Sequence, residues 1–242
     1  MEQNGTATVS GGCVTLPSRV LGIILSPRST YQALIQAPQW ADVLILSTLA
    51  AAVAGAIVMR TEVGQIALVD QWERTAAAFG RTVDDAAYAR LQQLSERGPV
   101  YEAGVAILNG PIQACAVAGL IFLAFGGRRQ GVTFRQVLSI AAHAGVILAL
   151  RQIIGAPATY LRETTASATA IGVWFPMFDE ASPAARFLGA MDVLVIWWVV
   201  VLGIGVATLY RKPTVRVASA MAGMYTVLAF VMAVAMALAG GE

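Results

Sequence analysis

The sequence predicts an all-α, polytopic membrane protein: a bundle of five transmembrane helices with interfacial helices before it and an extracytoplasmic helical hairpin inserted in it. Two observations lead to this fold class. Hydrophobic residues make up 57% of the 242 positions, and charged residues make up 12%, against about 25% in soluble domains. Apolar runs long enough to cross a hydrocarbon core of roughly 30 Å also recur along the chain.

The N-terminal region precedes the first apolar run. Residues 1–15 are polar and rich in Gly, Ser and Thr, without a basic start followed by an apolar stretch, so we expect a disordered tail and no signal peptide. Residues 16–41 predict two short helices separated at Ser26–Pro27, each with one arginine, Arg19 or Arg28. Both are too short to cross a bilayer. They are interpreted as cytoplasmic interfacial helices; the alternative is an amphipathic linker packed on the bundle.

The remaining chain, 42–242, forms the predicted five-helix membrane domain. Its fourth span is the most distinctive, because an acid, Asp192, lies near its start, a Trp197–Trp198 pair lies in its middle, and Tyr210 is followed by two basic residues at its end. An aromatic residue followed by positive charge is typical of a helix that reaches the cytoplasmic headgroups. The five predicted spans are 42–59, 105–125, 134–154, 187–210 and 215–238.

A polar region, 60–102, separates the first two spans and predicts a helical hairpin. Apolar residues recur every three to four positions from Ile66 to Phe79, and Gly80 then ends the first helix. The stretch from Thr82 to Asp85 resembles a capping box for a second helix. This hairpin either docks a partner or simply covers the mouth of the bundle.

Charge in the loops predicts the topology. The loops after the second and fourth spans contain basic residues and no acid, whereas the hairpin is mixed. Cytoplasmic loops carry the excess of Lys and Arg, so we expect a cytoplasmic N-terminus and an outside C-terminus. Lys212 is the only lysine, arginine supplies the other basic residues, and alanine is abundant; this bias favours a bacterial protein and therefore a bacterial cytoplasmic (inner) membrane. The basic residues of these loops are Arg128, Arg129, Arg135, Arg211, Lys212 and Arg216.

Ionisable residues inside spans are costly in lipid and are usually paired or functional. Arg151, near the end of the third span, and Asp192, near the start of the fourth, have similar predicted depths. We therefore predict that they are in contact. The contact is either a structural ion pair that holds two helices together or part of a ligand or proton site. Either Arg151→Asp or Asp192→Arg alone is predicted to prevent assembly of the protein. The double substitution, which exchanges the two charges, is predicted to restore it.

Three further polar residues within the predicted spans are candidate functional residues. His143 is the only histidine, so no zinc site with several histidines is available, and a hydrogen bond to Asn109, Gln113 or a backbone carbonyl is expected. Asn109 and Gln113 lie one turn apart in the second span. No motif indicates a catalytic residue, a cofactor site, a metal site or a nucleic-acid surface.

Two stretches resemble the Yip family, the Ypt/Rab-interacting membrane proteins, in its bacterial branch. The first, 19–37, reads RVLGIILSPRSTYQALIQA; the second, 187–212, reads FLGAMDVLVIWWVVVLGIGVATLYRK. The resemblance implies a five-helix membrane domain with a cytoplasmic N-terminus and no catalytic activity. Eukaryotic members bind small GTPases and shape membranes, but nothing in this sequence marks a GTPase-docking site.

The expected function is accordingly non-enzymatic: a membrane scaffold or accessory subunit that lies in the lipid bilayer and binds protein partners, lipids or further copies of itself. The alternative is a permease for small solutes or ions that uses the Arg151–Asp192 pair. A hydrated cavity that reaches both residues favours transport, whereas a dry, sealed ion pair favours the scaffold.

Overall fold

The computed structural model describes residues 15–78, 80–162, 167–175, 177 and 182–239. The described chain is all-α, as predicted, and the tail expected at residues 1–15 lies almost wholly outside it. The helices are α1 (Leu16–Leu25), α2 (Pro27–Gln36), α3 (Ala41–Met59), α4 (Glu62–Ala78), α5 (Asp85–Ser95), α6 (Gly98–Ala124), α7 (Phe134–Arg162), α8 (Pro183–Ala190), α9 (Val193–Leu209) and α10 (Thr214–Ala239), with short 3₁₀ turns η1 (Gly127–Gln130) and η2 (Ile171–Trp174).

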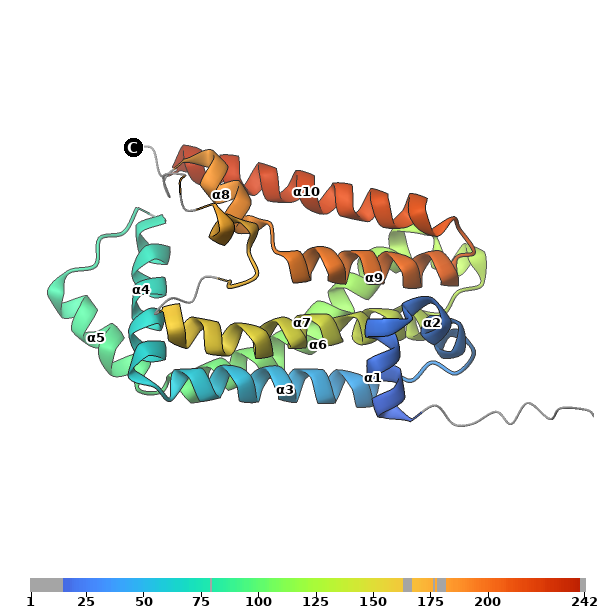
Figure 1. Cartoon of the computed structure of the whole chain (residues 1–242), viewed down its shortest axis with the longest axis horizontal. Helices are drawn as coiled ribbons and strands as arrows, with labels where there is room; N and C mark the ends of the chain where they lie inside the picture. Colours follow the sequence, from blue (N-terminus) through green and yellow to red (C-terminus); the bar gives the residue numbers. More distant parts are fainter. Residues whose placement is uncertain (1–14, 79, 163–166, 176, 178–181, 240–242) are drawn as a thin grey trace, which may run out of the picture.

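Five helices run roughly along the long axis of the molecule: α3, α6, α7, α9 and α10 (Figure 1). Helix α4 lies across one end, which we call the hairpin end, and α1 and α2 lie at the opposite end, the N-terminal end. Helix α7 contacts α3, α6 and α9, whereas the long helix α10 packs mainly on α9 and α8. Helix α7 is therefore the centre of the bundle, and Ile140, Ala144 and Ile147 on it are buried.

Four of the described helices are long and apolar enough to cross a membrane: α3, α6, α7 (over Phe134–Ala158) and α10 (over Thr214–Ala235). The predicted fourth span, 187–210, is not one helix, because the chain is extended at Met191 and Asp192 between α8 and α9. Helix α9 has 17 residues and is therefore about 26 Å long, slightly shorter than a typical hydrocarbon core.

Two other predicted boundaries differ from the structure. Helix α6 begins at Gly98, seven residues before the predicted span, because Pro99 occupies the first turn, where its missing N–H costs nothing. It continues through Pro111. Helix α7 continues eight residues beyond the predicted end at 154, through Pro157.

The predicted hairpin is present as α4 and α5. The positive φ of Gly80, 68°, lies just after α4, in the left-handed region that glycine tolerates best. The predicted cap is wrong: Asp84, not Thr82, precedes α5, and its carboxylate accepts a hydrogen bond of 2.7 Å from the Ala87 N–H. Asp84 is better placed because it directly precedes the first helical residue.

The two N-terminal helices pack on the bundle. Tyr31 of α2 is 0% exposed, and a Cβ on Gly205 of α9 would lie only 3.0 Å from its ring. Burial raises the pKa of the Tyr31 phenol, so this side chain stays neutral. On α1, the buried Arg19 forms an ion pair with Asp42 at the start of α3.

Tyr31→Ala is expected to release α2 from the bundle. Truncating a buried aromatic residue costs about 3–5 kcal/mol, whereas Tyr31→Phe loses only a 3.5 Å hydrogen bond to the Ile140 carbonyl and costs about 1 kcal/mol or less. The measurement is limited trypsin cleavage after the exposed Arg28 in detergent, with Tyr31→Phe as the control. Equal cleavage rates for the two variants would contradict the packing role of the ring.

Candidate functional site

Asp192 is the residue at which helix α9 begins. Its backbone is extended, and its carboxylate Oδ1 accepts hydrogen bonds from the backbone N–H groups of Leu194 (2.9 Å) and Val195 (3.2 Å). The first N–H groups of a helix lack partners within the helix, and aspartate is among the residues that satisfy them best. The acid in the apolar stretch therefore ends one helix and starts the next.

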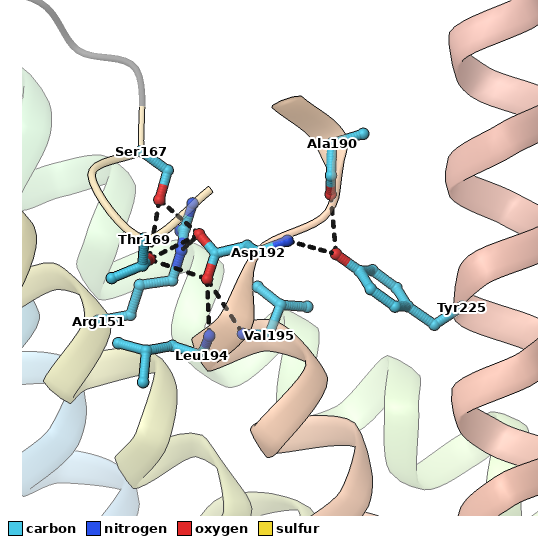
Figure 2. A network of polar contacts seen from close by, with 8 residues as sticks. All are labelled: Arg151, Ser167, Thr169, Ala190, Asp192, Leu194, Val195 and Tyr225. Atoms are coloured by element: carbon cyan, nitrogen blue, oxygen red, sulfur yellow. Dashed lines mark hydrogen bonds and ion pairs between the residues drawn. The ribbon is translucent and has the colours of Figure 1, made fainter. Parts of the chain in front are cut away.

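The same carboxylate receives three side-chain donors (Figure 2). Arg151 of α7 donates through Nε to Oδ2 at 2.7 Å, so the pair predicted from depth is in contact. Thr169 Oγ1 lies 2.9 Å from both carboxylate oxygens, and the Ser167 hydroxyl donates to Oδ2. With five donor groups on two oxygens, the hydrogen-bonding capacity of Asp192 is filled, and the residue is 3% exposed.

Backbone contacts join further elements to this point. Ala170 and Asp192 form an antiparallel bridge, in which Ile171 N donates to Met191 O over 2.7 Å and Val193 N donates to Thr169 O over 3.0 Å. The Tyr225 hydroxyl of α10 donates to the Ala190 carbonyl at 2.8 Å and lies 3.3 Å from the Asp192 N–H, which donates to it (Figure 2). We call Arg151, Ser167, Thr169, Asp192 and Tyr225 the Asp192 network; it joins α7, the segment before η2, α9 and α10.

Sequence reasoning found two members of this network and missed three. Asp192 was expected five residues inside a helix, but it caps one, and an acid directly before an apolar helix is the signal that could have shown this. Ser167, Thr169 and Tyr225 have no such signal. The serine and threonine lie in a loop without periodicity, and the tyrosine lies in a helix that is otherwise apolar.

The other side of Arg151 faces a cavity of about 220 Å³. The Arg151 side chain is 36% exposed, and a second charged residue, Glu102 of α6, also lines the cavity. Polar contributions also come from Gln71, Gln152 and Ser167, and Gly55 of α3 forms part of the wall. Asp192 is therefore closed to a ligand, whereas Arg151 is accessible from the cavity.

His143 is not part of this site. It is 0% exposed in the centre of α7, and its Nδ1 lies 2.8 Å from the carbonyl oxygen of Ser139. A backbone carbonyl is one of the three partners expected from the sequence. Among the described residues, no group of three or more His, Cys, Asp and Glu side chains could hold a metal ion.

Asn109 and Gln113 are separate from both His143 and the Asp192 network. Both are exposed on α6, and neither has a hydrogen-bond partner in the part of the chain that the structure describes. Gln113 borders a cavity of about 30 Å³ that Trp198 and Leu44 also line. The two amides are therefore not the partners of His143, which uses the backbone carbonyl of Ser139, the third of the expected alternatives.

Comparison with known proteins agrees with these features. The family model described as the Yip1 domain matches residues 21–236, which include nearly all of the described helices. No curated protein and no solved structure matches the chain. The long apolar helices and this match together identify a multi-pass membrane protein. The chain belongs to the Yip1 domain family.

Proposed function

We propose that this protein is a non-enzymatic membrane scaffold or accessory subunit that binds a protein partner through the exposed face of α6. The observation that supports this most directly is the position of Asn109 and Gln113, one turn apart and exposed in a long apolar helix. An amide that faces hydrocarbon loses the hydrogen bonds of water. Asn and Gln in membrane helices regain them by bonding across a helix–helix interface.

Helix α10 offers an internal comparison. It is about as exposed as α6, but from residue 220 to 235 its large exposed side chains are all apolar: Met224, Val227, Leu228, Phe230, Val231 and Met232. That composition suits lipid contact. The amides distinguish the α6 face from a lipid-facing surface and favour a protein partner there, either another membrane protein or a second copy of this chain.

Packing argues against a permease that uses the Arg151–Asp192 pair. Asp192 has no free hydrogen-bonding capacity for a solute. Between Arg151 and the N-terminal end of the bundle, α7 presents fully packed residues such as Ala144 and Ile147. A solute that enters at Arg151 therefore meets a packed core.

We further propose that α9 is the fifth span and that the hairpin lies outside a bacterial inner membrane. The loops at the N-terminal end of the bundle contain the basic, acid-free sequences described above, which favour a cytoplasmic N-terminus and an outside C-terminus. An engineered cysteine at the exposed Gln93 of α5, labelled from outside intact cells in a cysteine-free background, tests this orientation.

The partner surface is tested with Asn109→Leu/Gln113→Leu. Both substitutions keep the helix and remove the amides, so we expect at least a tenfold loss of the protein that co-purifies from native membranes in mild detergent, as measured by quantitative mass spectrometry. Met232→Leu on the apolar face of α10 is the matched control and is expected to retain the partner.

Two controls make the result interpretable. The double variant must elute from size-exclusion chromatography as a single folded species, since loss of fold also abolishes binding. Retention of a stoichiometric partner by a folded double variant would contradict the proposed surface. Absence of any stoichiometric partner, including a second copy, from the wild-type preparation would contradict the proposed function itself.

A further inference from the structure

Two opposite charges face the 220 Å³ cavity at the hairpin end without meeting each other. Arg151 of α7 and Glu102 of α6 both line it, but within the described residues Arg151 forms an ion pair only with Asp192, and Glu102 forms none. Opposite charges that are held apart across a cavity are suited to a ligand that carries the complementary charges in one molecule.

Each of the two residues has unused hydrogen-bonding capacity. Only Nε of Arg151 donates a hydrogen bond within the described chain, which leaves its two terminal amino groups for the cavity. The Glu102 carboxylate accepts no hydrogen bond from any described residue. Its side chain is held against α3, because a Cβ added to Gly55 would lie 2.6 Å from Glu102 Cγ.

The depth of the cavity matches the headgroup layer of a bilayer. Gly55, Val58 and Met59 belong to the last turns of α3, and Glu102 belongs to the second turn of α6, only four residues from its start. At about 1.5 Å per residue, Glu102 lies about 6 Å from the end of its helix. Helix α4 contributes Leu68 and Gln71 across the top.

We propose that this cavity binds a zwitterion with an anionic phosphate and a primary ammonium group, and that its source is the headgroup of an aminophospholipid. Arginine pairs with phosphate oxygens through two parallel N–H groups. A carboxylate accepts hydrogen bonds from a primary ammonium, whereas a quaternary ammonium has no N–H to donate. The volume far exceeds the roughly 10–15 Å³ that one water requires but is below that of a typical drug-sized site.

The charges also predict selectivity. Phosphatidylethanolamine supplies both complementary groups. Phosphatidylglycerol supplies only the phosphate, and phosphatidylcholine supplies a cation without N–H donors. The cavity is therefore expected to bind phosphatidylethanolamine more tightly than phosphatidylglycerol or phosphatidylcholine. This assignment goes beyond the proposed function, because it adds a lipid ligand to the protein partner proposed for α6.

The experiment measures binding of short-chain forms of the three lipids to delipidated protein in detergent, by native mass spectrometry. Wild type is expected to bind phosphatidylethanolamine at least tenfold more tightly than the other two. Glu102→Gln, which removes the charge and keeps the shape, is expected to abolish this preference, and Glu102→Asp is expected to retain most of it. Glu96→Gln, an exposed acid just after α5, is the matched control.

Three outcomes would overturn the proposal. Equal affinity of wild type for the three lipids, or an unchanged preference in folded Glu102→Gln, would show that the cavity is not the headgroup site. Competition by free phosphoethanolamine at the same concentration as the lipid would assign the cavity to a soluble zwitterion instead. A protein that binds phosphatidylethanolamine but has no protein partner would contradict the proposed function and leave this lipid site in place.

Discussion

Asp192→Ala is expected to lower the free energy of unfolding by about 2–5 kcal/mol, because it removes both a helix cap and several hydrogen bonds to a charged group. The alanine leaves the Arg151 guanidinium and two hydroxyls without their acceptor, and it also removes the cap of α9. Thermal unfolding in detergent, followed by circular dichroism, measures the change as a lower Tm.

Asp84→Ala is a suitable control because Asp84 also caps a helix, α5, but on the exposed hairpin and without an ion pair to any described residue. Loss of a cap alone costs about 0.5–2 kcal/mol. The difference between the two variants therefore isolates the contribution of the buried network. If Asp192→Ala were no more destabilising than Asp84→Ala, the network would contribute nothing beyond the cap.

The structure changes the expectation for the charge exchange. Arg151→Asp combined with Asp192→Arg restores opposite charges, but arginine has no acceptor for the Leu194 and Val195 N–H groups or for the two hydroxyls. The double variant is therefore expected to stay as unstable as Asp192→Ala. Arg151→Gln alone is expected to be milder, because Asp192 keeps its other four donors and Arg151 is more exposed.

The second large effect is expected from Gly203→Ala in α9. A Cβ at this position would lie 2.8 Å from the Ala218 Cα and 3.2 Å from its Cβ. Backbone atoms cannot move aside as a flexible side chain can, so α9 and α10 must separate. Overpacking of this kind costs about 1–3 kcal/mol. Gly203→Val is expected to lower the free energy of unfolding further than Gly203→Ala does.

Gly223→Ala in α10 is the matched control for this prediction. A Cβ there meets no atom within 4 Å, and alanine has a higher helix propensity than glycine by about 1 kcal/mol. We therefore expect Gly223→Ala to leave the Tm unchanged or to raise it slightly, and Gly203→Ala to lower it. A lowered Tm for both variants, or for neither, would contradict the close approach of the two helices.

Much of the fold could be predicted from the sequence because its signals are local. Apolar runs reveal the long helices, and Gly80 reveals the end of α4. The prediction of the fourth span as one helix was wrong for an equally local reason. Asp192, which was assigned to the interior of that helix, is instead the cap of α9. The contact of Arg151 with Asp192 followed from the cost of leaving either charge alone in lipid.

The sequence by itself determined the helical class, the membrane setting and the two charges that must find each other. Only the tertiary structure decided what surrounds them: Ser167, Thr169 and Tyr225 on Asp192, and the cavity shared by Arg151 and Glu102. These groups come from elements that lie far apart in the chain. Their meeting depends on how the helices pack and how the segment before η2 folds back, and no local pattern of residues encodes that geometry.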